Sequence, residues 1–218
     1  MTRATVLLDI DGTLVDSNYH HTIAWYRSLR RGGIIAPIAE IHRAIGMGAD
    51  QLLARFAPGR TDPFEEWWHA EFESSIDELA ATNGAAELVR HLAAAGTTNV
   101  YATSGSAQDV GRLRAVIDAD DAVTDAVNSN EVLTSKPAPD IFILAMERVA
   151  AVRDRTLVVG DSVWDVCAAT AAGIGCVGVT CGGTSAAELS EAGALAVYED
   201  PSDLLQRLPR SPIADVIG

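Results

Sequence analysis

The sequence predicts an α/β protein with a doubly wound parallel sheet and a helical segment inserted after the first strand. Three observations predict this fold. Residues 5–10 form a short apolar run, which suits a buried parallel strand. From residue 18 to 82 the strand signals disappear and helical patterns take their place. After residue 84, helical runs alternate with short strand-like runs, which is typical of parallel strands joined by right-handed helical crossovers.

The inserted segment carries four stretches with helical composition, at residues 19–29, 39–46, 49–57 and 62–81. In the last of these, apolar side chains recur every four residues and share one helical face: Phe64, Trp68, Phe72 and Ile76. We expect this face to pack in an apolar core rather than to contact a ligand. Asp62 and Pro63 suit the N-cap and the first helical position.

The remainder of the chain alternates regularly between helices and strands. Helices are expected at residues 85–96, 107–117, 139–150, 164–173 and 186–193. Strands are expected at residues 98–104, 122–129, 156–162, 174–180 and 195–199. We interpret residues 1–16 and 84–218 as one Rossmann-like core. Residues 17–83 are then an inserted α-helical cap domain, connected to the core near residues 14–18 and 80–85.

The charge and the composition of the chain limit the kinds of molecule that it is expected to bind. The formal net charge of −14 disfavours binding to nucleic acid or to anionic membranes. No apolar stretch approaches the length of a membrane span, and no secretory signal is recognisable at the start of the sequence. The cysteines, Cys167, Cys176 and Cys181, form no CxxC pair, and we expect them to be buried and reduced. A cytoplasmic protein is therefore expected, and the sequence leaves open whether it is a monomer or a homodimer.

Polar and charged residues follow several of the expected strands. They are Asp9 and Asp11, then Thr103, Ser104 and Gly105, then Lys136 ahead of a helix, and finally Asp161 with Asp165 one helical turn later. Each group alone could belong to an ordinary turn or helix cap. Because the carboxyl ends of parallel strands lie at one edge of a sheet, we expect the groups to converge there. Clustered carboxylates require a cation, and oxygen ligands favour Mg²⁺.

These residues resemble the motifs of the haloacid dehalogenase-like (HAD) superfamily hydrolases. The resemblance lies in four stretches, "DIDGTLVDS", "YATSG", "SKPAPD" and "VVGDSVWD", which occur in this order along the chain. The inserted helices are similar to the cap that follows the first strand in the phosphoglycolate phosphatase and β-phosphoglucomutase-like subgroup. The resemblance implies a Mg²⁺-dependent phosphatase that acts on a small phosphorylated metabolite.

The resemblance also implies roles for the acidic residues and the lysine. Asp9 would be the nucleophile that forms an aspartyl-phosphate. Asp11 would protonate the leaving oxygen and then take a proton from water, which requires a carboxyl group whose pKa can be raised. The Mg²⁺ ion would be held by Asp9, the backbone carbonyl of Asp11 and Asp161, while Asp165 would orient a water molecule or Lys136. Lys136 would offset the charge of the phosphate and the nucleophile.

Other residues of the resemblance would bind phosphate or support the acid. The Thr103 hydroxyl and the backbone N–H groups of Ser104 and Gly105 would donate to the phosphate. Gly12 would allow the tight turn after the first strand. His21 lies in a histidine position that recurs in the subgroup, and it could either support Asp11 near the hinge or simply pack within its helix.

The choice between phosphatase and phosphomutase depends on the cap. The resemblance implies cleavage of a phosphate ester and not displacement of a halide, because halide-displacing relatives lack an aspartate at the position of Asp11. A phosphomutase of the β-phosphoglucomutase type is the alternative, yet the position where mutases carry a phosphate-binding arginine is Ala49 here. Arg43 or Arg55 could substitute for that arginine. The candidate substrate loop, which could equally be a plain turn between helices, consists of Gly46, Met47 and Gly48.

Overall fold

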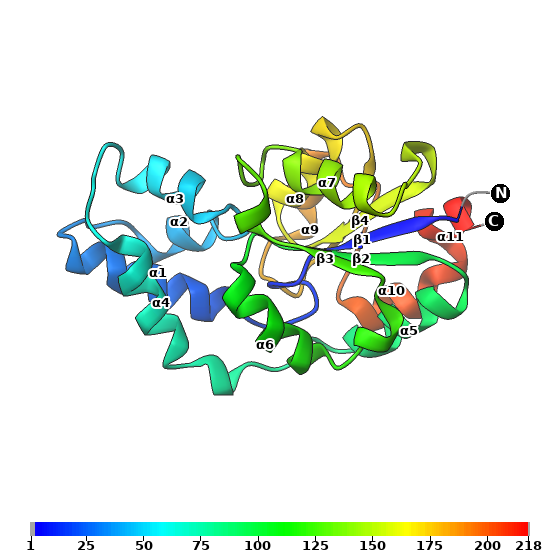
Figure 1. The fold of residues 1–218 in the computed structure, drawn as a ribbon, viewed down its shortest axis with the longest axis horizontal. Helices are drawn as coiled ribbons and strands as arrows, with labels where there is room; N and C mark the ends of the chain where they lie inside the picture. The colour runs from blue at the N-terminus through cyan, green and yellow to red at the C-terminus, as the bar shows by residue number, and fades with distance from the viewer. Residues whose placement is uncertain (1–2, 218) are drawn as a thin grey trace.

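The computed structural model, which describes residues 3–217, contains a six-stranded parallel sheet with helices on both faces (Figure 1). The strand order is β3-β2-β1-β4-β5-β6. The strands are β1 (Thr5–Leu8), β2 (Thr98–Ala102), β3 (Asp125–Val127), β4 (Thr156–Gly160), β5 (Gly175–Val179) and β6 (Ala196–Tyr198). The predicted doubly wound α/β fold is confirmed. The order reverses direction at β1 and β4, which are the two central strands.

Alternating side chains of the buried strand β1 divide the core between the two faces of the sheet. Val6 and Leu8 pack with helices α5 (Ala85–Ala94), α6 (Ala107–Ile117), α10 (Pro201–Arg207) and α11 (Pro212–Ile217). Leu7 packs on the opposite face with helices α7 (Asp140–Arg148), α8 (Val163–Ala171) and α9 (Ala186–Ala192). Helices α10 and α11 lie beyond the last element that the sequence pattern predicted.

The segment between β1 and β2 forms helices α1 (Asn18–Arg31), α2 (Ile38–His42), α3 (Ala49–Phe56) and α4 (Phe64–Glu73), which lie at one end of the molecule (Figure 1). It has an apolar cluster of its own that includes Trp25, Leu29 and Phe64. Its two connections to the core run side by side, because the Asp16 N–H donates to the Ala80 carbonyl at 2.9 Å. Division of the chain at residues 16 and 84 into core and cap remains our interpretation.

Helix α4 is shorter than the sequence pattern predicted. It ends at Glu73, and Ile76 begins a separate 3₁₀ turn (Ile76–Glu78). The hydroxyls of Ser74 and Ser75 donate to the Glu71 and Phe72 carbonyls at 2.7 and 3.1 Å, a local contact that competes with helix continuation. The expected Asp62 cap is also wrong: its carboxylate accepts instead from Arg60 Nε at 2.7 Å.

The strand expected at residues 122–129 is limited to the three residues of β3, between two short 3₁₀ turns (Asp120–Ala122 and Ser129–Glu131). The turn after β3 is fixed by a capping box in which the Asn128 and Glu131 side chains each accept a backbone N–H group. These side-chain contacts end the strand and place residues 129–131 beside the edge of the sheet where the polar groups were expected.

The three cysteines occupy different environments. Cys176 is buried, as expected, but Cys181 is half-buried and Cys167 is exposed on helix α8, so the expectation of burial is wrong for Cys167. The neighbours of Cys167 at positions 166, 168 and 169 fill the inner face of that helix. Burial raises the pKa of the Cys181 thiol to about 12. Across residues 3–217, no helix has the length and apolar composition that a membrane crossing requires.

Substitution of Leu7 by alanine tests the central position of β1. Leu7 is fully buried, whereas Leu133 is 98% exposed and provides a control of the same residue type. We expect Leu7→Ala to lower the free energy of unfolding by about 2–5 kcal/mol, because it removes buried methyl groups and leaves a cavity. Leu133→Ala should change it by less than about 0.5 kcal/mol. Urea unfolding followed by circular dichroism measures both, and equal effects would contradict the assigned core.

Candidate active site

The turn after β1 brings two carboxylates to the edge of the sheet. The Asp9 N–H continues the sheet by donating to the Val159 carbonyl at 3.0 Å, and the Asp9 side chain is buried. The chain then turns tightly, because the N–H groups of Leu14 and Val15 both donate to the Ile10 carbonyl, at 2.8 and 3.0 Å. Gly12 has a φ of +76°, which glycine adopts without strain.

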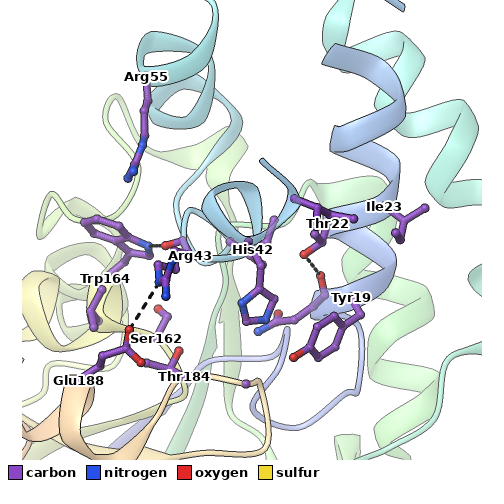
Figure 2. Close-up of a pocket in the computed structure, with 16 residues that line it drawn as sticks. Tyr19, Thr22, Ile23, His42, Arg43, Arg55, Ser162, Trp164, Thr184 and Glu188 are labelled. Atoms are coloured by element: carbon purple, nitrogen blue, oxygen red, sulfur yellow. Dashed lines mark hydrogen bonds and ion pairs between the residues drawn. The ribbon is translucent and has the colours of Figure 1, made fainter. Parts of the chain in front are cut away.

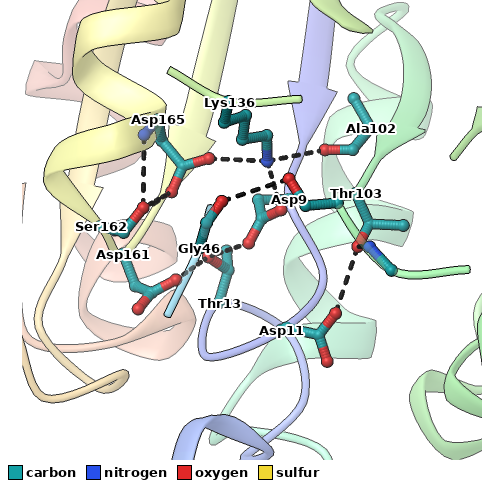
Figure 3. A network of polar contacts seen from close by, with 12 residues as sticks. Asp9, Asp11, Thr13, Gly46, Ala102, Thr103, Lys136, Asp161, Ser162 and Asp165 are labelled. Atoms are coloured by element: carbon teal, nitrogen blue, oxygen red, sulfur yellow. Dashed lines mark hydrogen bonds and ion pairs between the residues drawn. The ribbon is translucent and has the colours of Figure 1, made fainter. Parts of the chain in front are cut away.

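Lys136 is fully buried against this turn (Figure 3). Its Nζ lies 2.6 Å from Asp9 Oδ1, 2.7 Å from Asp165 Oδ1 and 3.0 Å from the Ala102 carbonyl oxygen. Burial alone would lower the pKa of Lys136, but the Asp165 and Asp9 carboxylates outweigh burial and raise that pKa above its ordinary value. The lysine is therefore a fixed ammonium ion, and it contacts Asp165, whose expected role of orienting a water molecule or Lys136 stays a prediction.

Asp161, at the end of β4, is held by neutral donors. Its two carboxylate oxygens accept from Thr13 Oγ1 at 3.0 Å and from Asn18 Nδ2 at 2.7 Å. Gly182 packs so closely that a Cβ at this position would lie 1.8 Å from Asp161 Oδ2. Two segments that are far apart in the sequence, residues 13–18 and the loop at Gly182, therefore fix the orientation of the Asp161 carboxylate.

Asp9, Asp161 and Asp165 form a buried cluster in which one carboxylate oxygen of each lies within 4.8 Å of the others. Burial, reinforced by the neighbouring carboxylates, raises the pKa of Asp9 to about 7 and raises that of Asp161 above its usual range. Lys136 supplies one positive charge against three acids, so a further cation would relieve the repulsion. The oxygen-only donor set fits a divalent ion such as Mg²⁺.

Asp11 points away from this cluster and lies in a different polar environment. Its carboxylate contacts Ser17 Oγ at 2.7 Å, His21 Nε2 at 2.8 Å and Thr103 Oγ1 at 3.1 Å. Burial alone would raise the pKa of Asp11, but His21 and the hydroxyl donors outweigh burial and hold the pKa below its ordinary value. The expected role of Asp11 requires a carboxyl group whose pKa can be raised, and the contacts with His21 and the hydroxyl donors act against such a rise.

His21 combines the two interpretations that the sequence left open. Its ring contacts Asp11, and its other surroundings are aromatic. The ring stacks on Phe72 with centroids 4.1 Å apart and planes inclined by 12°, and it also stacks on Trp68 at 5.5 Å. His21 is therefore packed within the helical segment and at the same time joins that segment to Asp11.

The loop after β2 lies directly across from Asp11. Thr103 Oγ1 donates to Asp11 and accepts from the Gly105 N–H at 2.9 Å. Ser104 Oγ donates to the Gly46 carbonyl at 3.2 Å, which joins this core loop to the cap. Helix α6 begins after Ser106, whose side chain accepts from the Asp109 N–H. The expected phosphate-binding residues are thus close to Asp11, and two of their donors have partners in this structure.

A cavity of about 130 Å³ opens onto Asp9 and Asp11. Its other walls come from the core loops at Thr103–Ser106 and Ser129–Asn130, and from the cap residues His21, Trp25, Ile45, Gly46, Met47, Ala49, Glu65 and Trp68. Trp25, Glu65 and Asn130 were not predicted from the sequence, and Trp68, which was expected in the apolar core, also lines the cavity. Phe64 and Phe72 of the same helical face are buried as expected.

Arg43, which was expected to contact the substrate, does not line the cavity that contains Asp9 and Asp11. It lines a second cavity of about 550 Å³, together with Arg55 and Trp164 (Figure 2). Its Nε is 3.6 Å from Glu188 Oε1, and its carbonyl accepts from Trp164 Nε1 at 2.9 Å. Both partners belong to core helices, because Trp164 lies on α8 and Glu188 lies on α9.

Gly48 does not line the cavity that contains Asp9, whereas Gly46 and Met47 do. A Cβ at Gly48 would lie 2.1 Å from Ser135 Oγ, so this glycine allows the cap loop to pack against the residue that precedes Lys136. The candidate substrate loop is therefore divided. Gly46 and Met47 face the cavity, whereas Gly48 packs against Ser135 of the core.

Comparison with known proteins identifies related sequences and structures. A family model described as haloacid dehalogenase-like hydrolase matches residues 4–173. Phosphoglycolate phosphatase of Rhodospirillum rubrum is 32% identical, over 91% of this chain and 88% of the relative. Hexitol phosphatase A of Escherichia coli is 33% identical, over 77% of this chain and 78% of the relative. The crystal structure of a hydrolase from Pseudomonas syringae superposes with a TM-score of 0.90 at 33% identity, covering 95% of this chain and 99% of the other.

Gly182 provides a test of the carboxylate arrangement. We expect Gly182→Ala to displace Asp161, because the added Cβ overlaps its carboxylate. Hydrolysis of p-nitrophenyl phosphate should fall by about 10²-fold, since small displacements of catalytic groups have effects of this size. Gly111→Ala is the control, because a Cβ at Gly111 meets no atom within 4 Å. Wild-type activity in both variants, with similar melting temperatures, would show that the close approach of Gly182 is unimportant.

Proposed function

Because the chain belongs to the haloacid dehalogenase-like hydrolases and is a phosphatase of that family, we propose that it hydrolyses a small phosphorylated metabolite with Mg²⁺ as cofactor and Asp9 as nucleophile. The observation that carries this proposal is the placement of Asp9. Its carboxylate is bound to the buried Lys136, belongs to a cluster of three acids and lines the cavity shared by core and cap. A carboxylate held in this way can capture a phosphoryl group.

In the first step, an Asp9 oxygen forms a bond to phosphorus as the bond from phosphorus to the ester oxygen breaks. Asp11 must first take up a proton when the substrate binds, and it then donates this proton to the departing alcohol. In the second step, water attacks the phosphorus of the aspartyl-phosphate and gives a proton to Asp11. This attack breaks the bond between phosphorus and the Asp9 oxygen, so phosphate is released and the Asp9 carboxylate is restored. Thr103 and the backbone N–H groups of Ser104 and Gly105 would orient the phosphoryl oxygens.

The remaining polar residues would balance charge. Asp9, Asp161 and the backbone carbonyl of Asp11 would hold Mg²⁺, which supplies positive charge to the phosphoryl oxygens when it is bound. Lys136 contributes a second fixed positive charge, and Asp165 keeps its ammonium group directed at Asp9. Asp165 also accepts from the N–H and the hydroxyl of Ser162 in the capping box of helix α8, which fixes the position of its carboxylate.

A phosphomutase is the less favoured alternative. It would need to hold a substrate with two phosphate groups, and Ala49 lines the cavity at the position where mutases carry an arginine. Arg43 and Arg55, the possible substitutes, line the second cavity instead. All three cysteines are free, which supports a reducing, cytoplasmic location for the proposed activity. The enzyme would act as a monomer or a homodimer.

The Asp9→Asn variant tests the nucleophile. We expect at least a 10³-fold lower rate of phosphate release, because an amide cannot replace a carboxylate as nucleophile. Asp16→Asn is the control, since Asp16 is an exposed aspartate seven positions later in the same connection. The wild-type protein, quenched with acid during turnover, should yield a phosphorylated peptide that contains Asp9. Equal phosphate release by wild type and Asp9→Asn would rule out the proposed role of Asp9.

Removal of divalent metal tests the cofactor. We expect a chelator to abolish phosphate release and added Mg²⁺ to restore it, because the acid cluster then lacks the cation that its charge requires. Sodium chloride at matched ionic strength should give no recovery. Full activity after exhaustive chelation, verified by elemental analysis, would mean that Lys136 alone balances the site.

A further inference from the structure

We infer that the leaving group of the substrate is an uncharged, hydroxylated alcohol of a few carbon atoms, and that Glu65 disfavours leaving groups with a second negative charge. The inference rests on the proposed phosphatase function and deepens it. Neither of the two relatives described above settles this choice, because the name of one refers to an acidic leaving group and that of the other to a polyol.

The charges around the cavity are the first argument. Among the described residues that line it, the charged side chains are the carboxylates of Asp9, Asp11 and Glu65, and none is lysine or arginine. Lys136 lies behind Asp9, is fully buried and is already in contact with two carboxylates. A phosphoryl group at Asp9 would meet Lys136 and the proposed Mg²⁺. A second anionic group at the cap end would meet no fixed positive charge.

The position of Glu65 makes that end of the cavity unfavourable for anions. Glu65 belongs to the first turn of helix α4, is exposed to solvent and lines the cavity beside Trp68. Later acids of the same helix have partners, because Glu71 pairs with Arg27 and Glu73 with Arg112. A substrate hydroxyl can donate a hydrogen bond to Glu65, whereas a carboxylate or phosphate oxygen cannot and would be repelled by it.

The uncharged walls are the second argument. Trp25 and Trp68 stack with centroids 5.3 Å apart, and together with Met47 they provide an aromatic and apolar wall. The C–H groups of a polyol pack on such a surface. On another wall, Asn130 accepts from the Ala107 N–H at 2.8 Å through Oδ1, so its amide nitrogen is the end that can donate to a hydroxyl.

The cavity also limits the size of the leaving group. Its volume is about 130 Å³, well below the range of about 300–1,000 Å³ that is typical of pockets for drug-sized ligands. A leaving group of a few carbon atoms is compatible with this space. The cavity is therefore small, and its walls offer apolar surface and groups that can hydrogen-bond to hydroxyls. Away from the expected phosphate position, the lining residues include no lysine or arginine.

A matched pair of substrates tests the inference. Phosphoglycolate carries a carboxylate where 2-hydroxyethyl phosphate carries a CH₂OH group, and the two are otherwise alike. We expect the wild-type enzyme to have a kcat/KM on the order of tenfold higher for 2-hydroxyethyl phosphate. Glu65→Gln should raise kcat/KM for phosphoglycolate on the order of fivefold, because it removes the repulsion and keeps the side-chain size. With 2-hydroxyethyl phosphate the same variant should lower kcat/KM on the order of twofold, because a neutral amide oxygen accepts a weaker hydrogen bond from the hydroxyl than a carboxylate does.

Glu66→Gln is the matched control. Glu66 is the next residue of the same helical turn, carries the same charge and does not line the cavity. This variant removes one negative charge from the surface at nearly the same place, so it should leave the ratio of the two kcat/KM values unchanged. Melting temperatures of both variants should match that of the wild type, because both side chains are exposed.

The outcomes separate the two proposals. If the wild type releases phosphate from neither substrate nor from p-nitrophenyl phosphate, the proposed function fails. If it hydrolyses p-nitrophenyl phosphate but prefers phosphoglycolate or ignores 2-hydroxyethyl phosphate, the phosphatase stands and the inferred substrate class is overturned. A ratio that Glu65→Gln leaves unchanged, or that Glu66→Gln changes equally, overturns the role of Glu65.

Discussion

The buried pairing of one ammonium group with several carboxylates is the constraint on which the site depends. Lys136 contacts Asp9 and Asp165 at 2.6 and 2.7 Å, while Asp161 completes a group of acids that one positive charge cannot balance. Neutral donors such as Asn18 fix the excess carboxylate. The protein thus holds its acids away from water in a geometry that a further cation would stabilise, and the repulsion among the carboxylates supports the proposed binding of a divalent ion.

The sheet explains why residues so distant in sequence meet, and why this part of the site could be predicted. Strand β1 lies between β2 and β4, so the residues after these three strands, Asp9, Thr103 and Asp161, reach one edge. Parallel strands bring their carboxyl ends together whatever the details of side-chain packing. The pattern of buried strands and crossover helices was therefore sufficient to predict the convergence. It could not predict that Asp11 would turn away from the acid cluster toward His21, because that depends on the tight turn at Gly12.

The surface of the cap was harder to predict, for a physical reason. Residues four apart on a helix differ by only about 40° in orientation, so this spacing identifies one face but does not distinguish the positions within it. Phe64 and Phe72 are buried, while Trp68, which lies between them, lines the cavity. Likewise, Arg43 could not be placed from sequence, because its orientation depends on Glu188, a residue of the core that is remote in the chain. Sequence periodicity identifies an apolar face, but only packing between the two segments decides which part of that face a ligand can reach.

His21 connects the chemistry of the core with the wall of the cap. Its ring contacts Asp11, stacks on Phe72 and lies beside Trp68, so the proposed proton donor and the surface that meets the leaving group belong to one packed unit. A leaving group that displaced Trp68 would also disturb the contact between His21 and Asp11. Because only interactions that improve in the transition state accelerate the reaction, this coupling allows the fit of the remote part of the substrate to affect the rate as well as binding. Selectivity in this enzyme would then be expressed in kcat as much as in KM.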